Sequence, residues 1–165
     1  MDDKLKGDLA EAVVKYLFRA ADLRGLFSIE TFDGRVSLFN YLESCKNLNI
    51  DIGELDERLV KRNGIPIPDL AVVTNKRGLE LIEVKYRGNG INPWFKDDVA
   101  KIWKEWQCQI ILVSREKYPE FGNFAVIDNG DIMTARSVLT VEHWKISEAI
   151  LKKCESIIEK IYSQT

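Results

Sequence analysis

Residues 68–85 have the sequence PDLAVVTNKRGLELIEVK and predict the central hairpin of the protein. Two apolar runs flank the loop Lys76-Arg77-Gly78, in which glycine suits the left-handed position of a three-residue turn. We therefore expect two antiparallel strands with Asn75 opposite Leu79. This register pairs the other residues as Val73 with Leu81, Ala71 with Glu83 and Asp69 with Lys85.

The same hairpin brings three charged side chains together. Side chains alternate between the two faces of a strand, so we expect Asp69, Glu83 and Lys85 on one face. Charges in an apolar setting are costly without partners, and two carboxylates supply the oxygen ligands that Mg²⁺ prefers. Such a metal can lower the pKa of bound water and neutralise a phosphate. The alternative is an ion cluster at the sheet edge that holds no ligand.

Two short patterns in the chain resemble those of one nuclease superfamily. Pro68-Asp69 followed by Glu83-Val84-Lys85 is similar to the PD-(D/E)XK motif, with a hairpin between its two halves. Upstream, Gly7-Asp8-Leu9-Ala10-Glu11 resembles the G-x-x-A-E form of archaeal Holliday-junction resolvases. The resemblance covers the order of elements from about Gly7 to Ser114. It implies a restriction-endonuclease-like α/β sandwich that hydrolyses phosphodiesters.

The resemblance also implies a role for each residue of the site. Asp69 and Glu83 would bind Mg²⁺, with the carbonyl of Val84 as a further ligand and Glu11 binding directly or through water. Lys85 would position the attacking water or stabilise charge at phosphorus. Mn²⁺ should substitute, and Ca²⁺ should bind without turnover, because catalysis needs tight geometry. The basic residues expected to contact nucleic acid are Arg87, Lys96 and Lys101.

Composition indicates one ordinary globular domain over residues 1–165. Hydrophobic residues make up 45% and charged residues 30%, and no apolar run approaches the length of a membrane span. The charged N-terminus lacks the pattern of a signal peptide, and the dispersed cysteines, Cys45, Cys108 and Cys154, suit buried thiols. We therefore predict a cytoplasmic protein. The net charge of −2 argues against non-specific coating of DNA, so affinity must come from a local patch, a dimer or a recognised shape.

Hydrophobic periodicity predicts the remaining elements. An amphipathic helix should run from Leu5 to about Arg24, with Glu11 beside a small apolar edge formed by Val14 and Phe18. That position either brings Glu11 to the metal site or leaves it solvated. Further along the chain we expect a strand at 27–32, an insertion at 35–64 with two short helices, a helix started by Asn92 and Pro93, a buried strand at 109–114, a hairpin of 124–127 with 132–135, and a helix from Val141 onward.

Together these elements predict an α/β sandwich with a mixed central sheet. The sequence also argues against several enzyme classes. The single histidine, His143, has no partner for a zinc site, and no P-loop or G-x-S-x-G motif is present. We expect a Mg²⁺-dependent DNA endonuclease of resolvase-like or restriction and recombination type. The alternative is a catalytically silent nuclease-fold module that binds nucleic acid or scaffolds a complex. The apolar C-terminal stripe and the insertion together suggest a homodimer, with no membrane partner.

Overall fold

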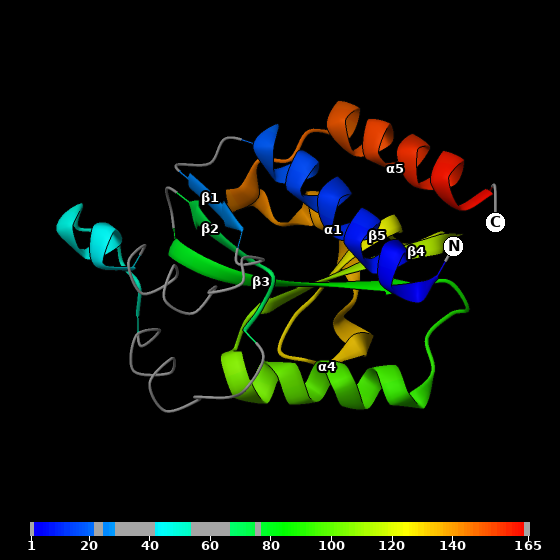
Figure 1. Ribbon diagram of the computed structural model, residues 1–165, viewed down its shortest axis with the longest axis horizontal. Coiled ribbons are helices and arrows are strands. Elements are labelled where there is room, and N and C mark those ends of the chain that lie inside the picture. The colour runs from blue at the N-terminus through cyan, green and yellow to red at the C-terminus, as the bar shows by residue number, and fades with distance from the viewer. Residues whose placement is uncertain (1, 22–24, 29–41, 54–66, 75–76, 164–165) are drawn as a thin grey trace.

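The computed structural model describes residues 2–21, 25–28, 42–53, 67–74 and 77–163 (Figure 1). Within these residues, a six-stranded mixed sheet has the order β1-β2-β3-β4-β5-β6, with β3 and β4 parallel and the other neighbouring strands antiparallel. The elements are α1 (Asp3–Arg19), β1 (Gly25–Ser28), β2 (Leu70–Thr74), β3 (Gly78–Arg87), α4 (Pro93–Trp106), β4 (Gln109–Tyr118), β5 (Gly122–Ile127), β6 (Arg136–Ser137) and α5 (Glu148–Ser163). The predicted α/β class with a mixed sheet is confirmed.

Helices cover both faces of the sheet, as Figure 1 shows. One core lies beneath α1 and α5 and includes Leu70 and Ile82 of the central strands. The other lies beneath α4 and includes Ala71 and Leu81. Because successive strand residues alternate between these two cores, both faces of the hairpin are apolar and the sheet is the middle layer of the protein. Among the described residues, no helix is both long and apolar enough to cross a bilayer.

The helix that follows the hairpin begins where the sequence predicts. The side chain of Asn92 accepts a hydrogen bond from the backbone N–H of Phe95 (3.0 Å), and Pro93 occupies the first turn. Gln107, with φ of 49°, ends α4 in the left-handed conformation. The helix α1 ends at Arg19, earlier than predicted, and Gly25 is the first residue of β1 instead of a helix stop.

The predicted register of the hairpin is wrong by two residues. Thr74 pairs with Gly78, and Ala71 lies opposite Leu81 instead of Glu83. A contact outside the hairpin explains the shift: the N–H of Leu79 donates to the carbonyl oxygen of Asp51 (3.0 Å). A Cβ atom on Gly78 would lie 2.3 Å from that same oxygen, so the glycine is needed as the first residue of β3. A shift of two residues preserves the faces on which the side chains lie.

The insertion contributes to the core where the structure describes it. Residues 42–47 are helical, and Leu42, Cys45 and Ile52 are buried in the core beneath α4. This part of the insertion is therefore an added packing layer over that core. The rest of the predicted strand 27–32 beyond Ser28, and the predicted helical residues 54–60, lie outside the described residues.

The C-terminal part of the chain differs from the prediction in two places. Residues 132–134 form a 3-10 turn capped by Asp131 instead of a strand, and the strand that pairs with β5 is Arg136–Ser137. His143 lies in a 3-10 turn, Glu142–Trp144, and α5 begins only at Glu148. The apolar stripe of α5 is buried against its own sheet and α1. Most of the apolar surface that suggested a homodimer is thus used within the chain, and the homodimer remains a prediction.

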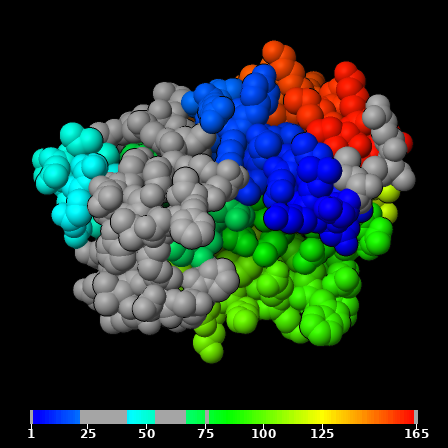
Figure 2. Space-filling view, in the orientation of Figure 1, coloured from blue at the N-terminus to red at the C-terminus, as the bar shows by residue number. Residues whose placement is uncertain are grey.

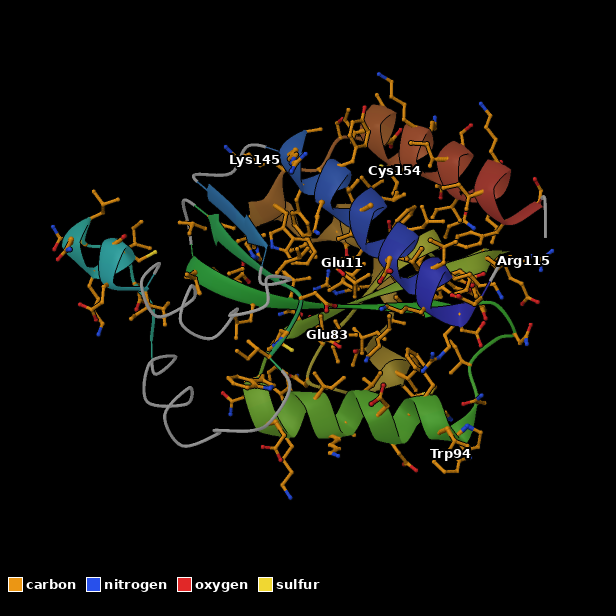
Figure 3. All side chains as sticks on the ribbon, in the orientation of Figure 1. Glu11, Glu83, Trp94, Arg115, Lys145 and Cys154 are labelled. Carbon is orange, nitrogen blue, oxygen red and sulfur yellow. The ribbon has the colours of Figure 1, made fainter. Side chains whose placement is uncertain are left out.

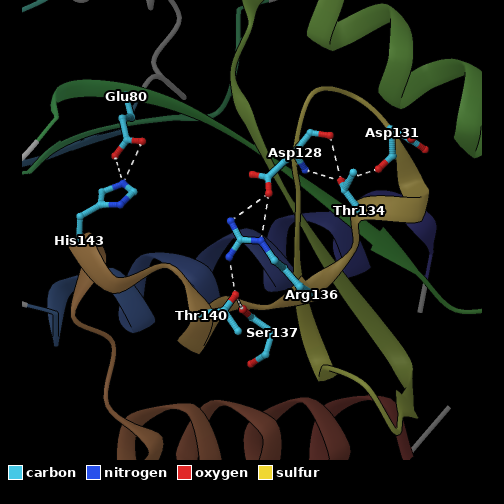
Figure 4. A network of polar contacts seen from close by, with 8 residues as sticks. All are labelled: Glu80, Asp128, Asp131, Thr134, Arg136, Ser137, Thr140 and His143. Carbon is cyan, nitrogen blue, oxygen red and sulfur yellow. Dashed lines mark hydrogen bonds and ion pairs between the residues drawn. The ribbon is translucent and has the colours of Figure 1, made fainter.

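Glu80 on β3 fastens the 3-10 turn to the sheet (Figure 4). Its carboxylate accepts hydrogen bonds from the indole N–H of Trp144 (3.1 Å) and contacts Nε2 of His143 (2.8 Å). Nearby, Arg136 pairs with Asp128 (2.9 Å) and spans the loop between β5 and β6. Trp144 is fully buried, so its N–H needs this acceptor.

We predict that Glu80→Ala lowers the free energy of unfolding by about 1–3 kcal/mol, because a buried indole donor loses its acceptor. Urea denaturation of the variant and the parent measures this difference. Glu116→Ala, which removes an exposed glutamate from β4, is the control and should change stability by less than about 0.5 kcal/mol. Equal stability of the two variants would show that Glu80 does not fasten the turn.

Candidate metal and phosphodiester site

The backbone pairing between β2 and β3 stops at Leu70, and beyond it the side chain of Asp69 contacts the backbone of β3. The register, continued past Leu70, would pair Pro68 with Val84. Directly opposed residues in such a pair exchange two hydrogen bonds, and proline has no N–H to donate. The carboxylate of Asp69 instead accepts the N–H of Val84, with Oδ2 2.7 Å from the nitrogen. The N–H and C=O of one strand residue point to the same edge, so the carbonyl of Val84 faces the side on which Asp69 lies.

Glu83 lies next to this opening, on the face of the sheet that α4 covers. Its side chain is only 13% exposed, and Oε1 is 2.9 Å from Nζ of Lys85. Burial raises the pKa of the Glu83 carboxyl to about 7, and the negative charge of Asp69 adds to the rise, while Lys85 opposes it. Asp69 and Glu83 are therefore close enough to repel each other, which is the condition that a shared cation relieves.

Lys85 is held between two carboxylates. Its ammonium lies 2.9 Å from Glu83 and 3.3 Å from Oδ2 of Asp98 on α4. Burial tends to lower the pKa of Lys85, but the charges of Glu83 and Asp98 outweigh it, so the pKa is raised and the ammonium stays charged. The prediction that Asp69, Glu83 and Lys85 share one face agrees with these contacts.

Glu11 comes from the opposite layer. It lies on α1, where Oε1 is 3.3 Å from Nζ of Lys15. In the view of Figure 3, Glu11 is on the α1 side of β3 and Glu83 is on the α4 side. Val14 and Phe18 are fully buried, as the sequence predicts, but α1 packs over the face that carries Ile82. Among the described residues, no three His, Cys, Asp or Glu side chains are grouped to hold one metal ion.

The basic residues predicted to contact nucleic acid divide into two groups. The guanidinium of Arg87 stacks over Phe95, 4.3 Å from the ring centroid, and Nη1 donates to the carbonyl of Tyr86 (3.0 Å). Arg87 also lines a hollow of about 570 Å³ that includes Val84 and Lys85. Lys96 and Lys101 are exposed on α4 and do not line this hollow.

Sequence reasoning missed Asp98 as a member of the site. The signal was present: Asp98 lies three residues after Phe95 and directly before Val99, both fully buried, so it sits at the edge of the stripe that faces the sheet. The three cysteines are buried and free, as predicted. Burial and the charge of Glu83 raise the pKa of the Cys108 thiol, which therefore stays neutral beside the site.

The donor chemistry of this cluster fits a divalent cation. Asp69 and Glu83 contribute two carboxylates, and the carbonyl of Val84 points to the same edge. With Asp98 included, carboxylates outnumber the single ammonium of Lys85, so the cluster is negative when fully ionised. Oxygen donors with a net negative charge are the ligands that Mg²⁺ and Ca²⁺ prefer. The chemistry of these donors is therefore compatible with such an ion.

Because folding raises the pKa of Glu83 above its ordinary value of 4.5, burying its charge costs stability. This cost grows as pH rises from about 4.5 to about 7 and is complete above that range. We predict that Glu83→Gln removes it, so that, without metal, the variant gains stability relative to the parent between pH 5 and pH 8 by about 1–3 kcal/mol. Urea denaturation in EDTA across this range measures the gain.

The pH-dependent part of the difference is the readout, because loss of the contact with Lys85 adds a nearly constant offset. Glu116→Gln controls for the loss of one exposed glutamate. A stability difference between Glu83→Gln and the parent that does not vary with pH would show that Glu83 titrates like a solvated carboxyl.

Comparisons with known proteins leave the family open. No protein-family model matches the chain, and no curated protein matches it significantly. The similarity of Pro68-Asp69 and Glu83-Val84-Lys85 to the PD-(D/E)XK motif therefore stays a prediction from the sequence, to be judged on the geometry of the site.

Proposed function

We propose that this protein is a metal-dependent nuclease that hydrolyses phosphodiester bonds in nucleic acid, with DNA as its substrate. The observation that carries the proposal is the placement of Asp69, Glu83 and Lys85 beside the first residue of β2, where its pairing with β3 stops. Two carboxylates share an opening in the sheet, one with its pKa raised by burial and by the other, and an ammonium lies 2.9 Å away. Such perturbed groups cluster at functional sites.

Each residue of the cluster has a distinct proposed role. Asp69, Glu83 and the carbonyl of Val84 would hold Mg²⁺, which when bound activates water and offsets phosphate charge. Lys85 offers a permanently charged ammonium to the negative charge that develops at phosphorus. Asp98 is a positioning residue, because it forms a second ion pair with the ammonium, 3.3 Å from Nζ of Lys85. Glu11 would contact the metal from α1 through a water molecule. In the structure its carboxylate is paired with Lys15, so this role stays a prediction.

The type of nuclease is proposed from the resemblance of residues 7–11 and from the insertion. Residues 7–11, which resemble the first motif of archaeal resolvases, lie on α1 above the central strands. The insertion 35–64 departs from the compact resolvase pattern, and its described part, residues 42–53, packs against the start of β3. We therefore propose an endonuclease in the broad sense, whose junction, flap or duplex preference is read from a panel of substrates.

Asp69→Asn is the sharpest test of the metal role. The amide oxygen can still accept the N–H of Val84, so the fold is kept, while the negative charge is lost. We predict that cleavage with Mg²⁺ of single-stranded, duplex, flap and four-way DNA falls by about 10²-fold or more. The assay compares single-turnover rates of parent and variant, with EDTA as a blank for both.

Asp131→Asn is a matched control, because Asp131 also accepts a backbone N–H, from Met133 (2.9 Å), but lies outside the site. It should cleave at the parent rate. Cleavage by Asp69→Asn at the parent rate, or parent activity that EDTA does not abolish, would overturn the proposed function.

Lys85 and Asp98 should act as one unit. We predict that Lys85→Ala lowers the single-turnover rate by about 10²-fold with little change in substrate binding, because its contact strengthens as charge develops. Asp98→Asn should lower the rate by about 3- to 10-fold, and the double variant should be no slower than Lys85→Ala. The neighbouring exposed residue provides the control, Asp97→Asn, which should leave the rate unchanged.

Additive effects of Lys85→Ala and Asp98→Asn would show that Asp98 does not act through Lys85. Equal losses in binding and in rate for Lys85→Ala would make the lysine an ordinary phosphate anchor.

A further inference from the structure

A hollow of about 570 Å³ borders the site on the side where β3 has no β2 partner. Its floor is the last part of β3 and the turn that follows it, residues 84–90. Its walls come from the first turns of α1 and α4 and from the far part of β4. In Figure 2 the blue surface of α1 lies directly above the green surface of β3 and α4. The hollow therefore runs from Lys85 towards the surface between two helix ends.

Positive charge predominates in this hollow, although the whole chain has a net charge of −2. Its lining includes four cationic side chains and one acidic residue, Asp3. Among the described residues, no carboxylate lies within ion-pair distance of Arg87 or Arg115. The other two cations are already paired, Lys6 with Asp3 (3.1 Å) and Lys85 within the site. Arg115 is exposed. Arg87 stacks on Phe95 and donates one hydrogen bond to Tyr86, but no carboxylate in the described part of the chain neutralises its charge, so both arginines can attract an anion that enters the hollow.

An exposed tryptophan stands at the rim of the same hollow. Trp94 is 85% exposed, whereas Trp106 and Trp144 of the same chain are buried. Its backbone is well held, because it lies in the first turn of α4, directly after Pro93 and within the cap formed by Asn92. Figure 3 shows Trp94 and Arg115 at the same end of the molecule, on opposite sides of β3 in that view. An exposed aromatic ring on a capped helix end leaves its face open to a base, and bases stack on such rings in proteins that bind single strands.

We infer that this hollow binds an unpaired strand of nucleic acid, with one base stacked on Trp94 and neighbouring phosphates against Arg87 and Arg115. The inference rests on the proposed function, because Lys85 of the site lines the same hollow. Stacking on an aromatic side chain requires a base that is not already stacked inside a duplex, whereas phosphate contacts alone do not distinguish the two. The combination selects substrates with a single-stranded segment beside the bond that is cut.

Binding measured without turnover tests this inference. Parent and variants are titrated in EDTA with a short oligothymidine, with a duplex of the same length, and with an oligomer that carries abasic sites in place of bases. Intrinsic tryptophan fluorescence reports stacking, because Trp94 is the tryptophan most accessible to a base. Anisotropy of a labelled strand reports affinity independently.

We expect oligothymidine to quench the parent's fluorescence and to bind Trp94→Ala about 10-fold more weakly, with the quenching lost. Trp94→Phe should retain part of the affinity, and the abasic oligomer should bind parent and Trp94→Ala equally. Arg115→Ala should lower the slope of log affinity against log salt by about 0.7. The controls are Met133→Ala, which removes an 82% exposed side chain elsewhere, and Lys153→Ala on α5; both should match the parent.

Two results would overturn the inference: unchanged oligothymidine binding by Trp94→Ala, or equal losses for oligothymidine and duplex. The nuclease proposal fails separately. If the parent binds oligothymidine through Trp94 but cleaves no substrate with Mg²⁺, the binding site stands and the nuclease proposal is wrong. If the parent cleaves with Mg²⁺ but Trp94→Ala binds every strand as tightly as the parent does, the nuclease proposal stands and the stacking site is wrong.

Discussion

The arrangement of the candidate site depends on where the ladder between β2 and β3 stops. Pro68 would be the next partner of Val84, but it cannot donate a hydrogen bond, so regular pairing stops. The carboxylate of Asp69 completes the pairing by accepting the N–H of Val84 at 2.7 Å. This single hydrogen bond places a negative charge at the end of one strand and beside Glu83 on the next. Beyond it, the exposed edge of β3 forms the floor of the adjoining hollow.

The charges at this opening are unfavourable for folding without a ligand. Glu83 is nearly buried, close to Asp69, and only partly compensated by Lys85. A cluster of this kind lowers the stability of the fold. In natural proteins such destabilising arrangements occur mainly at functional sites. The apolar layers on both faces of the sheet, with α1 and α5 on one side and α4 on the other, supply the stability that the cluster removes.

Much of this arrangement is predictable from the sequence, because local rules govern it. The alternating pattern of residues 68–85 gives the faces of the strands, and Asn92-Pro93 gives the start of α4. The register of the hairpin is not predictable in the same way, since the carbonyl of Asp51, distant in the sequence, decides where Gly78 lies. The error of two residues left Asp69, Glu83 and Lys85 on the predicted face, because side chains repeat with a period of two.

The parts that sequence reasoning missed depend on how helices are placed. Helical periodicity predicts that Val14 and Phe18 are buried, but not which face of the sheet they cover, so the approach of Glu11 to the site stays a prediction. Asp98 joins the site only because α4 crosses beneath Lys85. Trp94 belongs to a helix whose other tryptophans lie in or near the core, and its exposure follows from its place in the first turn.

The central claim is that Asp69 and Glu83 bind one divalent cation together, and calorimetric titration with Mn²⁺ tests it most directly. At pH 7 the Glu83 carboxyl is partly protonated, because its pKa is about 7, so binding must release a fraction of a proton. Titration in two buffers of different ionisation enthalpy measures that fraction. We predict that the parent binds Mn²⁺ with proton release and that Asp69→Asn does not bind it. Equal Mn²⁺ affinity of the two proteins, or no binding by the parent, would contradict it.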